Sequence, residues 1–146
     1  MGSTLTNLLC HVVFSVQGRR NLLTADRRKT LYAYVGGIIR GEGGQLLVIG
    51  GTRDHVHILM RLPASVSLSH MMQRVKGGSS RRMNEECSFR WQEGYGAFSV
   101  SKSAVEQVKS YIESQQERHS RMDFANELRR LLDRHGIEYN ERYLWD

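Results

Sequence analysis

The sequence predicts an α+β protein with a ferredoxin-like βαββαβ sandwich, an antiparallel sheet and additional C-terminal helices. Apolar, β-branched runs and segments of helical periodicity follow one another in the order strand–helix–strand–strand–helix–strand, which is the order of that fold. Two further helical segments follow the last predicted strand. The 146 residues are 40% hydrophobic and 25% charged, a composition and length that suit one globular domain over residues 1–146.

The first half of the chain supplies three predicted strands and one helix. Apolar runs bounded by glycine or proline mark the strands, and an apolar stripe that follows a capping threonine marks the helix. The predicted elements are a strand at 7–16, a helix from Thr24 to about Arg40, a strand at 45–49 and a strand at 55–62. Gly50-Gly51 is interpreted as the turn between the last two strands.

The second half supplies one more strand and three helices. Each helix is marked by a residue that can cap its N-terminus and by apolar residues three and four positions apart. The predicted elements are a helix after Ser67 that extends to about Met83, a glycine-spaced aromatic strand at 91–100, a helix opened by a Ser103–Glu106 capping box that extends to about Arg118, and a last helix from Asp123 to Gly136.

The charge balance is basic. Lys and Arg number 21 against 15 Asp and Glu, which gives a net charge of +6 and a pI near 9.7. Such a balance favours polyanionic partners, nucleic acid first among them. Cys10 and Cys87 are too few for a disulfide framework and lack metal-ligand spacing, so we expect a reducing compartment. No signal segment or membrane-spanning run is evident, and a cytoplasmic protein is expected.

Two histidines in the third predicted strand form a candidate metal site. A strand directs alternate side chains to opposite faces, so His55 and His57 share one face while Val56, Ile58 and Met60 fill the other, as the core side of a half-buried strand. Paired imidazoles on one face can hold a cation. The alternative is two polar histidines on a solvated face of the sheet.

A second polar pair lies on the helix opened by the capping box. Tyr111 and Gln115 are four residues apart, so they lie one above the other at the edge of an apolar stripe. Gln115 offers a carbonyl oxygen and Tyr111 a phenol. The alternative is a tyrosine packed by its ring beside a solvated glutamine. The other histidines, His11, His70, His119 and His135, have no partner at useful spacing and are interpreted as structural or solvated.

The segment from Lys76 to Arg82 places glycines and hydroxyls among cations, which would let a phosphate backbone approach closely. A frayed basic helix on a solvated surface explains the same residues equally well.

These pieces together resemble the single-tyrosine HUH transposases of the IS-two-hundred-like insertion-sequence family, over nearly the whole chain from about Cys10 to Trp145. The matching motifs are Cys10-His11-Val12-Val13-Phe14, Asp54-His55-Val56-His57-Ile58-Leu59, Val75 to Arg81, Trp91 to Val100, Tyr111-Ile112-Glu113-Ser114-Gln115 and Tyr139 to Leu144. Arg53 stands where proline is common in the family, and Gln17-Gly18 replaces a Thr-Lys pair, which leaves the DNA preference open.

The resemblance implies an enzyme that cleaves and rejoins single-stranded DNA through a 5′-phosphotyrosine, at ends marked by DNA hairpins. It implies Tyr111 as nucleophile, and His55, His57 and Gln115 as ligands of Mg²⁺ or Mn²⁺. It also implies a homodimer, in which the tyrosine helix of either subunit can complete the site. Two alternatives are a non-catalytic ferredoxin-like nucleic-acid-binding module and a domesticated HUH nickase. The basic residues expected to contact the DNA backbone are Arg19, Arg20, Lys76, Arg81 and Arg82.

Overall fold

The computed structural model describes residues 2–118 and 122–144. The strands are β1 (Leu8–Ser15), β2 (Gln45–Gly51), β3 (His55–Leu62) and β4 (Gly96–Ser99). The helices are α1 (Ala25–Gly41), α2 (Leu68–Met83), α3 (Val105–Glu113), α4 (Gln115–Arg118) and α5 (Phe124–Arg134), with short 3-10 turns η1 (Gln17–Arg19) and η2 (Lys102–Ala104). His119 and Trp145, named above from the sequence, lie outside the described residues.

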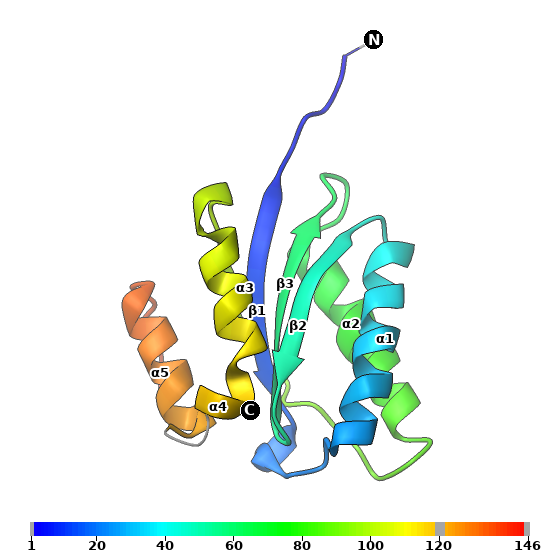
Figure 1. Cartoon of the computed structure of the whole chain (residues 1–146), viewed down its shortest axis with the longest axis vertical. Coiled ribbons are helices and arrows are strands. Elements are labelled where there is room, and N and C mark those ends of the chain that lie inside the picture. Colours follow the sequence, from blue (N-terminus) through cyan, green and yellow to red (C-terminus); the bar gives the residue numbers. More distant parts are fainter. Residues whose placement is uncertain (1, 119–121, 145–146) are drawn as a thin grey trace.

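The strands form one antiparallel sheet in the order β2-β3-β1-β4. This is the strand order of the ferredoxin-like fold, so the predicted fold class is confirmed. α1 and α2 cover one face of the sheet, while α3 and α5 lie on the other (Figure 1). None of the described helices is both long and apolar enough to cross a bilayer.

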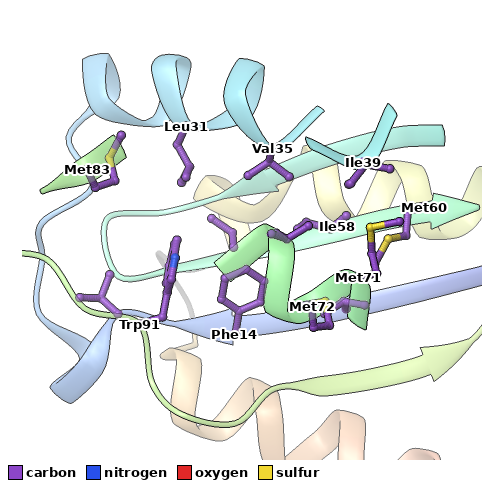
Figure 2. Close-up of a cluster of buried hydrophobic side chains, with 14 of the residues drawn as sticks. Phe14, Leu31, Val35, Ile39, Ile58, Met60, Met71, Met72, Met83 and Trp91 are labelled. Carbon is purple, nitrogen blue, oxygen red and sulfur yellow. The ribbon is translucent and has the colours of Figure 1, made fainter. Parts of the chain in front are cut away.

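The main apolar core lies between the sheet and the α1/α2 pair. β3 contributes Val56, Ile58 and Met60 to it, which are at most 1% exposed, as the alternation in the sequence predicts. Figure 2 shows Ile58 and Met60 beneath the Leu31–Val35–Ile39 stripe of α1, with Met71 and Met72 of α2 beside them. Burial of so many apolar side chains on this face supplies most of the hydrophobic stabilisation of the fold.

The opposite face of the sheet carries two smaller apolar clusters. Val13 of β1 and Phe98 of β4 pack against α5, and Leu9 and Leu59 pack against α3. The same face carries the buried polar residues His11, Ser15, His55 and His57. The prediction that both histidines share one face of β3 is confirmed, but that face is covered by helices and is not solvated.

Gly50 and Gly51 end strand β2 and are not a separate turn, which corrects the sequence interpretation. A Cβ atom on Gly50 would lie 2.3 Å from the backbone oxygen of Ile112 in α3, and one on Gly51 would lie 2.2 Å from the backbone oxygen of His55. Gly50 is therefore needed because the C-terminal end of α3 approaches the sheet closely, and Gly51 is needed because the β3 backbone at His55 and Val56 lies against it.

The predicted strand at 91–100 is shorter in the structure, where only Gly96–Ser99 pair with β1. Trp91 forms an isolated bridge with Val16. Between them, the backbone carbonyls of residues 92–94 accept hydrogen bonds from the Lys76 ammonium at 2.6–2.8 Å. These carbonyls turn toward a cation on α2, so this part of the chain does not extend the ladder.

The Ser103–Glu106 capping box does not form. Thr24, Ser67 and Asp123 each cap a helix with their side chains, as predicted. At α3, by contrast, the chain enters through η2, so Ala104 occupies the N-cap position without a side-chain bond.

Candidate active site

His55 and His57 are both fully buried, and each is held through its Nδ1 atom. His55 Nδ1 lies 2.8 Å from Asp54 Oδ1 and 3.0 Å from Thr52 Oγ1. His57 Nδ1 lies 2.8 Å from His11 Nε2. With a proton on each Nδ1, both residues keep the lone pair of Nε2 for a ligand, which is the usual arrangement of a metal-binding histidine and its supporting partners.

His11 belongs to the site, although the sequence interpretation made it structural or solvated. Burial, reinforced by the proximity of the His57 ring, lowers the pKa of His11 to about 3, so this imidazole is neutral at physiological pH. A neutral His11 can accept a hydrogen bond from His57 through Nε2. His11 and His57 meet because β1 and β3 are adjacent antiparallel strands: Val13 is the register partner of His57, and His11 lies two residues before Val13 on the same face. The spacing of residues along the sequence does not reveal this contact between His11 and His57.

Tyr111 reaches the histidines from the end of α3 and Gln115 from the start of α4, so the two residues do not lie on one continuous helix as predicted. The Ser114 hydroxyl donates to the Tyr111 carbonyl at 3.2 Å, and the helix is interrupted at Ser114 before α4 begins at Gln115. Gln115 is 1% exposed, with its Oε1 atom 2.9 Å from His55 Nε2. The Tyr111 ring lies edge-on to His57, with centroids 5.6 Å apart.

Glu127 of α5 also belongs to this cluster, and sequence reasoning missed it. It is 5% exposed, and its Oε1 atom lies 2.9 Å from His57 Nε2 and 3.5 Å from His55 Nε2. Its Oε2 atom accepts hydrogen bonds from Gln115 Nε2 at 3.0 Å and from the Tyr111 hydroxyl. One feature of the sequence could have identified Glu127: it lies between Phe124 and Leu128, on the inward-facing side of an amphipathic helix.

Within the described residues, His55, His57 and Glu127 form a group that could hold a metal ion. The donor chemistry fits a cation. In the tautomers that Asp54 and His11 favour, the Nε2 lone pairs face carboxylate and amide oxygens, which are acceptors as well. A cation at the point where they converge would resolve this mismatch. A set of nitrogen and oxygen donors is compatible with Mn²⁺, and carboxylate oxygen also suits Mg²⁺.

A cavity of about 760 Å³ opens beside this cluster and is lined mainly by α3 and α5. His11, Tyr111 and Glu127 line it. Two cations of α5, Arg130 and Arg134, also line it and are one helical turn apart. The acidic Glu117 is part of the same lining. The nucleophile candidate therefore borders a space large enough for a small ligand and flanked by two guanidinium groups.

The five basic residues predicted to contact DNA are not in this cavity. Arg81 is exposed on α2, on the other face of the sheet, where Arg82 pairs with Glu85 and Glu86 at 3.0 and 3.8 Å. Lys76 is held by the 92–94 carbonyls, and its burial lowers its pKa to about 8. Arg19 and Arg20 are exposed at η1 and directly after it.

The sequence model of the IS200-like transposases matches residues 4–115, which include His55, His57, Tyr111 and Gln115. The chain belongs to this family. The IS200 transposase of Salmonella typhimurium is 25% identical over 126 residues, covering 80% of this chain and 82% of the relative. The ISDra2 transposase TnpA of Deinococcus radiodurans is 25% identical over 117 residues, covering 74% and 84%.

Solved structures share the fold of this transposase. A crystal structure from Deinococcus radiodurans R1 superposes with a TM-score of 0.63 and 22% identity, covering 79% of this chain and 95% of that one. A REP-associated tyrosine transposase, in a structure bound to a REP hairpin, superposes with a TM-score of 0.60 and 13% identity, covering 77% and 68%.

Proposed function

We propose that this transposase cleaves and rejoins single-stranded DNA with Tyr111 as its nucleophile. The observation that carries the proposal is the convergence of the Tyr111 hydroxyl, both histidine Nε2 atoms and the Gln115 amide on one buried carboxylate, Glu127. A phenol used only for packing would not need its hydroxyl beside a potential metal site. The family membership makes DNA the substrate class that this arrangement would serve.

In the proposed reaction, the Tyr111 oxygen attacks a DNA phosphate. The new bond joins phosphorus to the tyrosine oxygen, while the bond from phosphorus to the 3′ oxygen breaks. The phenolic proton is lost, and the departing 3′ oxygen gains a proton to become a free hydroxyl. Rejoining reverses these steps, since a 3′ hydroxyl attacks the 5′-phosphotyrosine and releases Tyr111. One phosphodiester bond is exchanged at each step, so no external energy source is needed.

His55, His57 and Gln115, together with Glu127, would hold a divalent metal ion, Mg²⁺ or Mn²⁺. Bound there, the metal would supply Lewis-acid stabilisation of charge on the phosphate. Asp54 and His11 would keep the two imidazoles in the required tautomer and orientation.

The DNA strand would reach Tyr111 through the cavity between α3 and α5, where Arg130 and Arg134 could neutralise phosphates next to the cleaved bond. Arg19, Arg20 and Arg81 are exposed and are proposed contacts for DNA farther from the cleavage site. Lys76 and Arg82 were predicted for the same role, but the intramolecular bonds that already engage them make them weaker candidates. A hairpin is the proposed element of recognition, by analogy with the hairpin-bound neighbour.

The test is the formation of a covalent protein–DNA adduct. The full chain would be incubated with Mg²⁺ or Mn²⁺ and a pool of labelled oligonucleotides in which a hairpin flanks a randomised single-stranded segment. We expect an adduct that survives denaturing electrophoresis, is lost on chelation with EDTA, and is absent from the Tyr111→Phe variant. Sequencing the attached DNA would identify the cleavage site. Failure of the wild-type chain to form any adduct would favour a non-catalytic binding module.

A substrate identified in this way also separates transposition from nicking. Recovery of rejoined strands or circles, in addition to the adduct, is expected of a transposase that reverses the cleavage on a new 3′ hydroxyl. An adduct without any rejoined product would favour the nickase alternative.

We also propose a homodimer in which each subunit uses its own tyrosine. The support is that α3 packs on β2 and β3 of its own chain, with Tyr111 beside that chain's His57. Mixing a His57→Ala protein with a Tyr111→Phe protein tests this, because only exchange of helices between subunits would rebuild one intact site. We expect no recovery of adduct formation, and recovery after mixing would contradict this arrangement. Sedimentation analysis would report the oligomeric state separately.

A further inference from the structure

We propose that Glu127 ties the nucleophile to the metal site, with one carboxylate oxygen as a metal ligand and the other as the acceptor that positions the Tyr111 hydroxyl. This inference rests on the proposed function and assigns a role to a residue on α5. The match to the family model ends at residue 115, so Glu127 lies outside the segment on which family membership depends.

α5 is fixed in place by contacts that do not involve Glu127 itself. Asp123 caps its first turn by accepting from Asn126 N at 2.9 Å. Leu128, Leu131 and Leu132 pack against the sheet in the cluster that contains Val13 and Phe98. Phe124 stacks on the His55 ring, with centroids 4.5 Å apart and planes 24° from parallel. Glu127 is therefore delivered to the histidines by a helix that is already docked, which is the condition for a well-positioned ligand.

The two oxygens of Glu127 face different groups. Oε1 lies 2.9 Å from His57 Nε2 and 3.5 Å from His55 Nε2, the two atoms expected to bind the metal. Oε2 accepts from the Tyr111 hydroxyl and from Gln115 Nε2. One planar carboxylate thus fixes the separation between the attacking oxygen and the metal-binding atoms. The Gln115 bond also orients that amide, so that its Oε1 atom is the one facing His55.

Burial explains why a carboxylate can serve both groups. A carboxylate that is 5% exposed is stable only if its charge is compensated. A divalent cation beside Oε1 would supply that compensation, while the hydroxyl and amide hydrogens satisfy Oε2. An alanine at this position would remove a ligand and also leave the Tyr111 hydroxyl without this acceptor. A glutamine would keep one oxygen for the hydroxyl but would remove the negative charge.

The first measurement is the affinity of the full chain for Mn²⁺ without DNA, with electron paramagnetic resonance as the method of detection. We expect Glu127→Ala to weaken Mn²⁺ affinity by at least about tenfold, as loss of a ligand or of its immediate support does. Asp133→Ala is the matched control, because it removes an exposed carboxylate from the same helix without touching the site or the packing of α5. It should keep wild-type affinity within about threefold. Unchanged Mn²⁺ affinity in Glu127→Ala would overturn the ligand role.

The second measurement is the single-turnover rate of adduct formation at saturating Mn²⁺ and saturating DNA. Mispositioning of the attacking oxygen should slow Glu127→Ala by about 100-fold with little change in the DNA dissociation constant. Glu127→Gln should react at least about tenfold faster than Glu127→Ala, because its amide oxygen can still accept a hydrogen bond from the Tyr111 hydroxyl. A Glu127→Ala rate equal to that of Asp133→Ala would overturn the positioning role.

Tyr111→Phe separates failure of this inference from failure of the proposed function. If Tyr111→Phe still forms the adduct, the proposed nucleophile is wrong. If Tyr111→Phe is inactive while Glu127→Ala reacts like the wild type, only the role of Glu127 is wrong.

Discussion

On the α1/α2 face of the sheet, β3 buries Val56, Ile58 and Met60 in an apolar cluster, whereas on the α3/α5 face the same strand buries His55 and His57. The apolar face needs only complementary shape and the exclusion of water. The polar face needs a partner for every buried nitrogen and oxygen, and among the described residues no such side-chain atom lacks one. Stability and activity are therefore expected to depend on opposite sides of a single strand.

Substitutions at two neighbouring positions provide the strongest test of this division. His57→Ala should lower adduct formation by at least about 100-fold and weaken Mn²⁺ binding, because a ligand is lost. Ile58→Ala should instead lower the free energy of unfolding by about 2–5 kcal/mol, since Ile58 is fully buried in the α1/α2 core. Denaturant unfolding and the adduct assay at a temperature where both variants are folded would check this. Loss of activity in a folded Ile58→Ala protein would contradict the division of stability and activity between the two faces of β3.

Gly50→Ala should disturb the active face without touching a polar group. A Cβ atom there would meet the Ile112 backbone oxygen at 2.3 Å, so the end of α3 that carries Tyr111 must move. A displacement near 1 Å could slow adduct formation by up to about 100-fold. Gly37→Ala is the control, because a Cβ atom there has no atom within 4 Å and alanine favours the helix. A Gly50→Ala rate equal to that of Gly37→Ala would show that α3 tolerates the shift.

His11→Phe should weaken Mn²⁺ binding by about 10- to 100-fold, because His57 would lose the partner that orients its ring. Excess Mn²⁺ should restore much of the rate, since no ligand is removed. His135→Phe is a matched substitution at an exposed histidine that stacks on Phe98. Titration of both variants with Mn²⁺ would compare them, and equal affinities would mean that His11 does not support the metal site.

The smallest effects are expected from substitutions of basic residues. These substitutions test which face of the protein binds the DNA strand near the cleavage site. Replacing Arg130 and Arg134 by alanine should reduce the salt dependence of single-stranded DNA binding, by about 0.7 in the slope of log K against log salt for each lost phosphate contact. Arg81→Ala, on α2, should leave the slope for a short strand without a hairpin unchanged. Fluorescence anisotropy at several salt concentrations gives the slopes. The reverse pattern would place that strand on the α1/α2 face.

Local pattern was sufficient for most of the fold. Alternation in the 55–62 segment fixed which side chains of β3 face the core, because the period of a strand is two residues. The caps at Thr24, Ser67 and Asp123 placed three helix starts correctly, because each side chain satisfies an amide within its own first turn. The same reasoning failed at Gly50-Gly51, where the close approach of α3 and of the His55 backbone, and not a turn, explains the glycines.

By itself, the sequence determined the antiparallel α+β fold and the shared face of His55 and His57, but it did not predict the interruption at Ser114 that separates the helix of Tyr111 from that of Gln115. Only the tertiary structure showed that His11 and Glu127 complete the cluster. Their partners lie 46 and 70 residues away in the chain, and such contacts depend on strand register and on the docking of α5. Neither is encoded in the spacing of neighbouring residues, because both result from the packing of whole elements against the sheet.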